Sequence, residues 1–335
     1  MKLCLSDVIA ARGSIQTHVV RTPLLPAPCL SALLGVPLHM KMEIMQPVGA
    51  FKLRGAMNAA LSAPEGTHTL ACCSTGNHGR AVAYAARQLG LKAAVFMSSL
   101  VPQTKIEGIR RLSGEVQITG RSQDDAQIAC DAYSESPGVH AISPFDDLHV
   151  IAGQGTIGVE MLEDLPDLET LLVPLSGGGL AAGVALAART IKPGIRLIGV
   201  SMDRGAAMKA SLDAGEPVEV SEVESLADSL GGGIGLQNRF SYSMCQDYLD
   251  DVVLVSEEEI YQAMQTLYFE ENLVAEGGAV VGIAALMSRK IADLNGPVAT
   301  IVSGRNVDMK QFTDVVSGRD VVLGDLLVKG QSYGA

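Results

Sequence analysis

The sequence contains no tryptophan, and only 4% of its 335 residues are aromatic. Hydrophobic residues nevertheless make up 47% of the chain, so its core must consist mainly of aliphatic side chains. The 36 glycines favour tightly packed helices on a sheet, with tight turns between strands and helices. A chain of this length has room for two modest domains or one large one.

Basic residues are also scarce: 25 Lys and Arg against 37 Asp and Glu give a formal net charge of −12. This charge argues against nucleic acids and anionic membranes as partners, although solubility alone is the simpler explanation for it. The chain lacks an uncharged run long enough to cross a bilayer, and its first residues lack the apolar stretch of a signal peptide. Six scattered cysteines without a CxxC pair predict neither a disulfide framework nor a zinc site, which fits a reducing cytoplasm.

Short apolar runs alternate with helical patterns along most of the chain. Strands are expected at residues 37–43, 70–73, 93–97, 116–118, 139–143, 171–174, 195–200, 252–255 and 298–302. This alternation predicts an α/β fold with mostly parallel sheets flanked by helices. We expect a large domain of residues 1–68 plus 147–320, a small domain of residues 69–146, and a C-terminal tail of residues 321–335.

Helices are expected between these strands, at residues 6–20, 56–62, 80–89, 105–111, 124–133, 181–190, 206–212, 256–271 and 278–292. Ser6 or Asp7 would cap the first helix, and Ser256 with Glu259 has the spacing of a capping box. Residues 21–26 are expected to form an extended connector. The glycine-containing segment 153–156 is interpreted as the stretch that precedes the second series of strands and helices.

One lysine stands in an unusual setting. Lys52 lies in the stretch 49–56, between glycines and apolar residues and just before an alanine-rich helical run. A lysine that forms a Schiff base must spend part of its time as a neutral amine, and an apolar pocket lowers the cost of losing the charge. A lone lysine at a helix start is more often a surface residue, so the case for chemistry depends on the stretches that accompany it.

Two polar, glycine-containing loops each follow an apolar strand and precede a helix. In Ser176–Leu180, three successive glycines would let backbone N–H groups approach a phosphate at a helix N-terminus. This run matches neither a nucleotide P-loop nor a dinucleotide fingerprint, and a plain tight turn is the competing interpretation. In Ser74–Gly79, Asn77 could bind an aromatic oxygen, whereas His78 is better interpreted as a structural histidine. Ser303, at the end of the last strand, could reach a ring nitrogen.

Together these stretches resemble the threonine dehydratase and serine racemase family of fold-type II (tryptophan synthase β-like) pyridoxal-phosphate (PLP) enzymes. The resemblance rests on residues 51–56 (FKLRGA), 74–79 (STGNHG), 151–156 (IAGQGT), 173–180 (VPLSGGGL) and 303–306 (SGRN). It extends from about residue 5 to 315, with matching order and spacing. Within the family, the second and last stretches are most similar to the dehydratase associated with hydroxyectoine utilisation.

The resemblance implies a role for each motif. Lys52 would bind the cofactor covalently and then take the α-proton of the substrate, while Phe51 would lie against the cofactor ring. Asn77 would bind the ring hydroxyl and Ser303 the ring nitrogen. The phosphate would be held by Ser176, Gly177, Gly178, Gly179 and Leu180. The substrate carboxylate would dock at Ser74, Thr75 and His78.

Three positions depart from the family's usual residues. Thr75 stands where racemases carry serine and many dehydratases alanine, so it could donate a proton to the second face of the substrate. Arg305 replaces a glycine and could bind an anionic or polar substrate tail, or else face solvent. Ser201 replaces the leading carboxylate of the family's divalent-metal site, so no metal is predicted. The chain also ends soon after the last motif, which predicts a catabolic enzyme without a regulatory domain.

The main hypothesis is a PLP-dependent ammonia-lyase that eliminates water from a β-hydroxy-α-amino acid and yields a 2-oxo acid and ammonia. Candidate substrates are threonine, serine, 3-hydroxyaspartate and an amino acid derived from hydroxyectoine. Three alternatives stay open: an amino-acid racemase, a β-replacement enzyme that uses a thiol, and a non-catalytic amino-acid-binding protein. Lys52 argues against the last of these, because a binder would not need the amine. The family resemblance also implies a homodimer.

Overall fold

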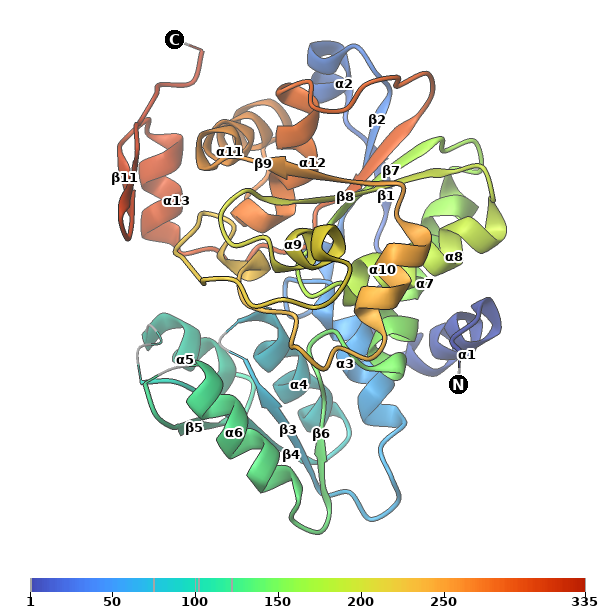
Figure 1. Ribbon diagram of the computed structural model, residues 1–335, viewed down its shortest axis with the longest axis vertical. Helices are drawn as coiled ribbons and strands as arrows, with labels where there is room; N and C mark the ends of the chain where they lie inside the picture. Colours follow the sequence, from blue (N-terminus) through green and yellow to red (C-terminus); the bar gives the residue numbers. More distant parts are fainter. Residues whose placement is uncertain (1, 75, 100, 102, 122, 335) are drawn as a thin grey trace.

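Two separate sheets organise the chain, in a computed structural model that describes residues 2–74, 76–99, 101, 103–121 and 123–334. Six strands form one sheet in the order β1-β2-β10-β7-β8-β9, and four form the other in the order β5-β4-β3-β6. The six-stranded sheet occupies the upper part of the molecule in Figure 1 and the four-stranded sheet the lower part. The prediction of an α/β fold with mostly parallel sheets is confirmed.

The six-stranded sheet is parallel apart from one edge. Its strands are β1 (Leu24–Pro26), β2 (Leu38–Lys41), β7 (Thr170–Pro174), β8 (Arg196–Met202), β9 (Asp251–Val255) and β10 (Val298–Ile301). Only β1 runs antiparallel to its neighbour, with Leu25 opposite Met40. The prediction of a connector at residues 21–26 is therefore wrong for its second half. Pro26 is tolerated there because an edge strand does not need every N–H group.

The four-stranded sheet is parallel throughout the described residues. It consists of β3 (Thr69–Cys73), β4 (Lys92–Met97), β5 (Glu115–Ile118) and β6 (Val139–Ala141), linked by α4 (Asn77–Gln88), α5 (Gln103–Arg110) and α6 (Gln123–Ser134). Helix α3 (Lys52–Leu61) contributes Leu53, Ala56 and Met57 to the apolar core under this sheet. The domain bounds given above stay a prediction.

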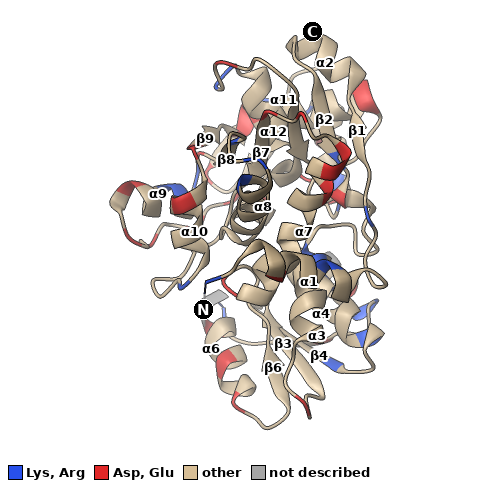
Figure 2. Ribbon diagram, turned by 90° about the vertical axis from the view of Figure 1, so that its right-hand side faces the viewer, with Lys and Arg blue, Asp and Glu red and all other residues tan. Residues whose placement is uncertain are grey.

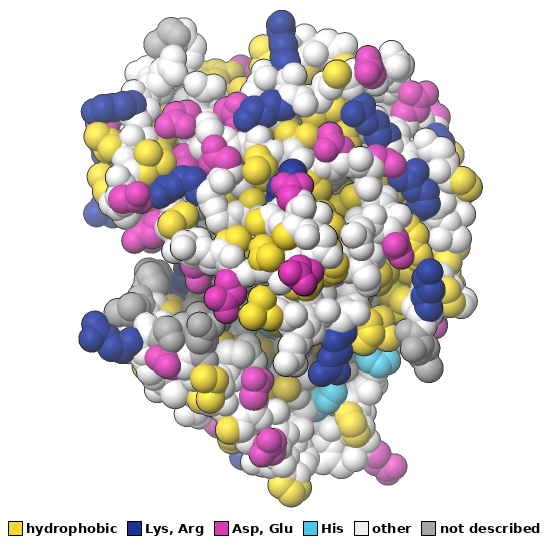
Figure 3. Space-filling view, viewed as in Figure 1, with side chains coloured by type: hydrophobic (Ala, Val, Ile, Leu, Met, Phe, Trp, Pro, Cys, Tyr) yellow, Lys and Arg dark blue, Asp and Glu magenta, His cyan; other side chains and the backbone are white. Residues whose placement is uncertain are grey.

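Most of the remaining helices cover the six-stranded sheet. They are α1 (Leu5–Ile15), α2 (Pro28–Leu34), α7 (Leu148–Asp164), α8 (Gly179–Ile191), α9 (Ala207–Ala214), α10 (Ser241–Tyr248), α11 (Glu257–Glu271), α12 (Gly277–Met287) and α13 (Met309–Val316). A hairpin of β11 (Val321–Leu323) and β12 (Leu326–Val328) follows, and short 3₁₀ turns lie at Glu43–Met45 and Asp228–Leu230. Acidic and basic side chains are intermixed on the face shown in Figure 3.

Two expected helix starts have different outcomes. At α11 the capping box is confirmed: Ser256 Oγ accepts from the Glu259 N–H at 3.3 Å, and Glu259 Oε2 accepts from the Ser256 N–H at 2.7 Å. At α1 the prediction is wrong, because Cys4 occupies the N-cap position and Asp7 accepts from its N–H at 2.9 Å. The helix also ends at Ile15 rather than at residue 20.

The glycine-containing segment 153–156 lies inside the 17-residue helix α7, which the sequence pattern does not predict. Glycine is unfavourable in an isolated helix, but here it permits very close helix packing. A Cβ on Gly153 would lie 2.6 Å from Arg54 O, and one on Gly155 would lie 2.9 Å from Gly183 O. Figures 1 and 2 show α3 and α7 next to each other where the two parts of the molecule meet.

Gly183→Ala in α8 is expected to lower the free energy of unfolding by about 2–3 kcal/mol, the usual cost of overpacking. Its Cβ would lie 2.2 Å from the backbone oxygen of Ile151. The matched control is Gly13→Ala in α1, where no atom lies within 4 Å of the new Cβ. That change should stabilise the protein by about 0.5–1 kcal/mol. Urea unfolding of both variants tests the pair, and equal midpoints would contradict the packing argument.

Candidate active site

The predicted motifs gather at the carboxyl ends of parallel strands from both sheets. Ser74 follows β3, Ser176 follows β7, and Ser303 lies two residues beyond β10. A further segment, Ile142–Asp147, follows β6 and was not singled out from the sequence. Ligands of parallel sheets bind outside these ends, so the motifs share one region of the molecule.

Lys52 is the first residue of α3 rather than part of a loop before it, as expected. Its Nζ donates a hydrogen bond to the backbone oxygen of Pro144 at 2.7 Å and lies 5.4 Å from the centre of the Phe51 ring. Burial lowers the pKa of Lys52 to about 8. The amine is therefore neutral for a useful fraction of the time near neutral pH, as a nucleophile or proton acceptor requires.

Acylation of Lys52 in the cofactor-free protein should follow a titration midpoint near pH 8. An ordinary lysine titrates near about pH 10.4, because nothing opposes its charge. The depressed pKa means that the reactive neutral form grows as the pH rises through 8. Competitive labelling with acetic anhydride, read by mass spectrometry of the Lys52 peptide, measures this midpoint. The exposed Lys92 provides an internal control, and a shared midpoint for both lysines would contradict the burial argument.

The glycine loop leads from β7 into α8, so that Gly179 and Leu180 are already helical. Gly178 has φ +88°, a conformation that glycine adopts without strain. A Cβ on Gly177 would lie 2.3 Å from the ring of Phe145. Ser241 Oγ donates to Gly177 O at 2.7 Å, which fixes the orientation of this peptide. The loop thus presents the N-terminus of a helix, a favourable place for a phosphate group.

The loop after β3 leads into α4, which begins at Asn77 and not at Arg80 as expected. Ser74 Oγ accepts from the Gly76 N–H at 3.3 Å, while Thr75 lies outside the described residues. His78 is buried, and its Nε2 donates to the backbone oxygen of Ile142 at 2.9 Å. Burial, with the Lys52 charge as a smaller cause, lowers the pKa of His78 to about 3, so the imidazole is neutral. Its Nδ1 has no partner among the described residues.

Asn77 belongs to a polar network that the sequence did not reveal. Its Nδ2 lies 3.0 Å from both carboxylate oxygens of Glu276, and its Oδ1 accepts from Asn306 Nδ2 at 2.6 Å. Glu276 also accepts from the Asn306 N–H at 2.6 Å, and Arg80 donates to Asn306 Oδ1 at 3.0 Å. Burial raises the pKa of Glu276. A buried carboxyl group thus lies next to the residue expected to bind the ring hydroxyl.

Ser303 and Arg305 lie on one strand exit but in different surroundings. Ser303 is buried, and its backbone oxygen accepts from the Phe51 N–H at 3.0 Å, which ties the strand end to the lysine helix. Arg305 is exposed, and its backbone N–H donates to Gly49 O at 2.9 Å. A Cβ on Gly49 would lie 3.2 Å from Arg305 Cγ, so the arginine covers the turn that precedes Lys52.

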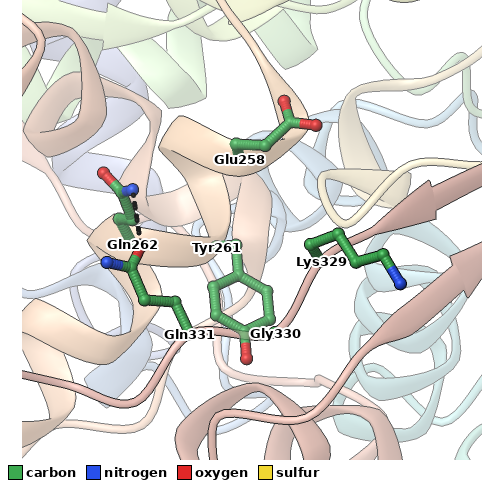
Figure 4. Close-up of a pocket in the computed structure, with 6 residues that line it drawn as sticks. All are labelled: Glu258, Tyr261, Gln262, Lys329, Gly330 and Gln331. Atoms are coloured by element: carbon green, nitrogen blue, oxygen red, sulfur yellow. Dashed lines mark hydrogen bonds between the residues drawn. The ribbon is translucent and has the colours of Figure 1, made fainter. Parts of the chain in front are cut away.

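Other features of the molecule lie apart from these motifs. A cavity of about 290 Å³ is formed by Glu258, Tyr261 and Gln262 of α11 with Lys329, Gly330 and Gln331, none of which is a predicted site residue (Figure 4). No group of three or more metal-binding side chains occurs among the described residues. Ser201 is buried and donates to the sulfur of Met202 at 3.5 Å. Within the part of the chain that the structure describes, no helix is long and apolar enough to cross a membrane.

The comparison with known proteins decides the family. A family model described as pyridoxal-phosphate dependent enzyme matches residues 15–304. The chain belongs to this family. A protein of Sinorhizobium fredii named "Putative threonine dehydratase" is 49% identical over 94% of this chain and 96% of its own length. The L-threonine ammonia-lyase of Geobacter sulfurreducens is 38% identical over 95% of this chain and 79% of its own.

Solved structures agree with this assignment. Maize serine racemase has a TM-score of 0.88 at 30% identity, and covers 94% of this chain and 97% of that one. The threonine deaminase of T.th. has a TM-score of 0.85 at 33% identity, with 91% and 99% covered. The predictions of a fold-type II architecture, of PLP as cofactor and of a PLP-dependent lyase are thereby confirmed. The narrower resemblance to a hydroxyectoine enzyme goes beyond what these relatives show.

The residues present fit pyridoxal phosphate. The family's aldehyde cofactor needs an amine, and Lys52 offers one with a lowered pKa. Its phosphate needs backbone N–H groups without bulky side chains, and the Gly177–Gly179 turn provides them at a helix N-terminus. Its ring nitrogen needs a polar partner, and Ser303 is a buried hydroxyl. We assign these three groups to the cofactor as a proposal, with Phe51 and Asn77 completing the ring site.

Proposed function

We propose that this protein is an ammonia-lyase that eliminates water from a β-hydroxy-α-amino acid, as its relatives named threonine dehydratase and L-threonine ammonia-lyase do. The observation that supports this most is the amine of Lys52, which has a pKa lowered to about 8 and lies beside a glycine turn at a helix N-terminus. An amine that is neutral near physiological pH can both hold an aldehyde cofactor and accept a proton. The product would be a 2-oxo acid and ammonia.

The chain's own groups divide the work among them. When bound, pyridoxal phosphate withdraws electrons from the α-carbon of the substrate. Lys52 Nζ would then take the α-proton, oriented by its hydrogen bond to Pro144 O. Ser303 is neutral and would leave the ring nitrogen without a proton, which favours loss of the β-hydroxyl group. Ser74, Thr75 and His78 would hold the substrate carboxylate, and for His78 the neutral side chain favours a backbone contact.

The substrate is expected to be small and polar. Threonine and serine are the first candidates, followed by 3-hydroxyaspartate and an amino acid derived from hydroxyectoine. Arg305 is exposed at the turn before Lys52, from which its guanidinium could bind an anionic or polar tail. We further propose a catabolic, cytoplasmic enzyme that forms a homodimer, in keeping with the 34% identity to the Escherichia coli protein named catabolic L-threonine dehydratase.

The purified protein with PLP should release 2-oxo acid from at least one member of a panel of β-hydroxy amino acids. Lys52→Ala should lose this activity by more than about 10³-fold and lose the visible absorbance band of the lysine-bound cofactor, because the amine serves twice. Lys92→Ala, at an exposed position, serves as the control. A cofactor band without 2-oxo acid from any member would contradict the lyase proposal.

An amino-acid racemase is the second candidate, because maize serine racemase matches over 94% of this chain. Racemisation needs a second proton donor on the opposite face of the substrate, and Thr75 is the residue proposed for it. Thr75→Ala should abolish any racemisation while sparing much of the elimination. Chiral chromatography of serine or aspartate after incubation measures the first activity, and 2-oxo acid the second. Equal losses of both would contradict this separation of roles.

A further inference from the structure

The chain that leaves β6 makes contacts with every part of the candidate site. This segment, Ile142–Asp147, is called here the β6 exit. Ile142 continues the pairing of β6 with β3 through its N–H group, which donates to Ala71 O at 2.9 Å. Its own backbone oxygen accepts from His78, and the oxygen of Pro144, two residues later, accepts from Lys52 at 2.7 Å. The imidazole and the amine are therefore held by one short stretch of backbone.

The next residue reaches the phosphate end of the site. Phe145 lies directly against the glycine turn: a Cβ on Gly177 would lie 2.3 Å from its ring, and one on Gly179 would lie 2.7 Å from its backbone. Replacing either glycine would therefore displace Phe145. The β6 exit thus touches the amine with Pro144 and the glycine turn with Phe145. Any movement of the exit would alter both ends of the cofactor site together.

Asp146 fastens this segment to the rest of the protein. Its carboxylate accepts three hydrogen bonds from consecutive backbone N–H groups that lead into α10: from Arg239 at 2.7 Å, Phe240 at 2.8 Å and Ser241 at 3.0 Å. A carboxylate at a helix N-terminus is favoured both by these charge-assisted bonds and by the helix dipole. The same Ser241 donates through Oγ to Gly177 O at 2.7 Å. Asp146, α10 and the glycine turn therefore form one connected unit.

The two neighbouring aspartates serve different helices. Asp147 Oδ1 accepts from the Val150 N–H at 2.9 Å and is the N-cap of α7. Its contact is local in the sequence, three residues away, whereas the contacts of Asp146 span 93 to 95 residues. A general role in stability therefore suits Asp147, and a role in joining the β6 exit to α10 suits Asp146.

We propose that Asp146 is a positioning residue that couples the Lys52 amine to the phosphate end of the cofactor site by holding the β6 exit against α10. The inference rests on the proposed assignment of Lys52 and the glycine turn to the cofactor. It does not depend on which amino acid is the substrate. Without the Asp146 carboxylate, Pro144 and Phe145 would lose their anchor. Water would then reach the Lys52 amine, and the glycine turn would lose its cover.

The experiment compares Asp146→Ala and Asp146→Asn with Asp147→Ala. Asp146→Ala should weaken the binding of PLP to the cofactor-free protein about tenfold, which corresponds to about 1.4 kcal/mol. It should also move the acylation midpoint of Lys52 upward from about 8, because burial is what lowers that pKa. Asp146→Asn keeps one acceptor oxygen but sets an amide donor against a backbone N–H, so it should lie between Ala and wild type.

Asp147→Ala removes a helix cap and is the matched control, since it changes an adjacent aspartate without contact to the site. It should lower the unfolding temperature while leaving both PLP affinity and the Lys52 midpoint as in wild type. The proposal is overturned if Asp146→Ala behaves in the same way. Should Asp146→Ala fail to fold, unchanged PLP affinity and Lys52 midpoint in Asp146→Asn would overturn it equally. Lys52 labelling requires neither cofactor nor substrate, so this result stands apart from the fate of the lyase proposal.

Discussion

The position of the reactive lysine depends on four charged side chains sealed inside the protein. Arg54, two residues after Lys52 in α3, donates to Glu43 at 2.9 Å and to Glu160 at 2.7 Å. Lys41 donates to the second oxygen of Glu160 at 2.6 Å, and all four residues are at most 3% exposed. Two positive and two negative charges leave no net buried charge. Loss of one partner would cost about 3–5 kcal/mol, because an unpaired charge would stay in the interior.

This network orients α3 from one side, and close packing holds it from the other. Burial alone would raise the pKa of Glu43, but the Arg54 guanidinium outweighs it and the pKa lies below its ordinary value. The charges therefore persist at neutral pH and keep their directional bonds. Next to Arg54, a Cβ on Gly55 would lie 2.7 Å from Val150 O, so α7 approaches the helix backbone directly. With both constraints, the first turn of α3 can place Lys52 reproducibly.

The sequence predicted what local patterns encode. Apolar runs marked the strands, and glycine or serine clusters marked the loops at their ends. Helix α7 escaped, because its glycines are explained only by the neighbouring backbones of α3 and α8. Asp146 and Glu276 escaped for a related reason: nothing near them in sequence distinguishes them from surface carboxylates. Their partners lie 93 to 95 residues away for Asp146 and 199 away for the Asn77–Glu276 pair.

Polar contacts join the two parts of the molecule, while separate apolar cores stabilise each part. The core under the four-stranded sheet and the cores of the six-stranded sheet contain different residues. Across the junction, Asn77 donates to Glu276, Arg80 to Asn306, and the N–H groups before α10 to Asp146. A hydrogen bond can be exchanged for one to a ligand at little net cost, whereas an opened apolar core loses its packing energy. A site at this junction can therefore admit a polar cofactor and an amino acid without disturbing either core.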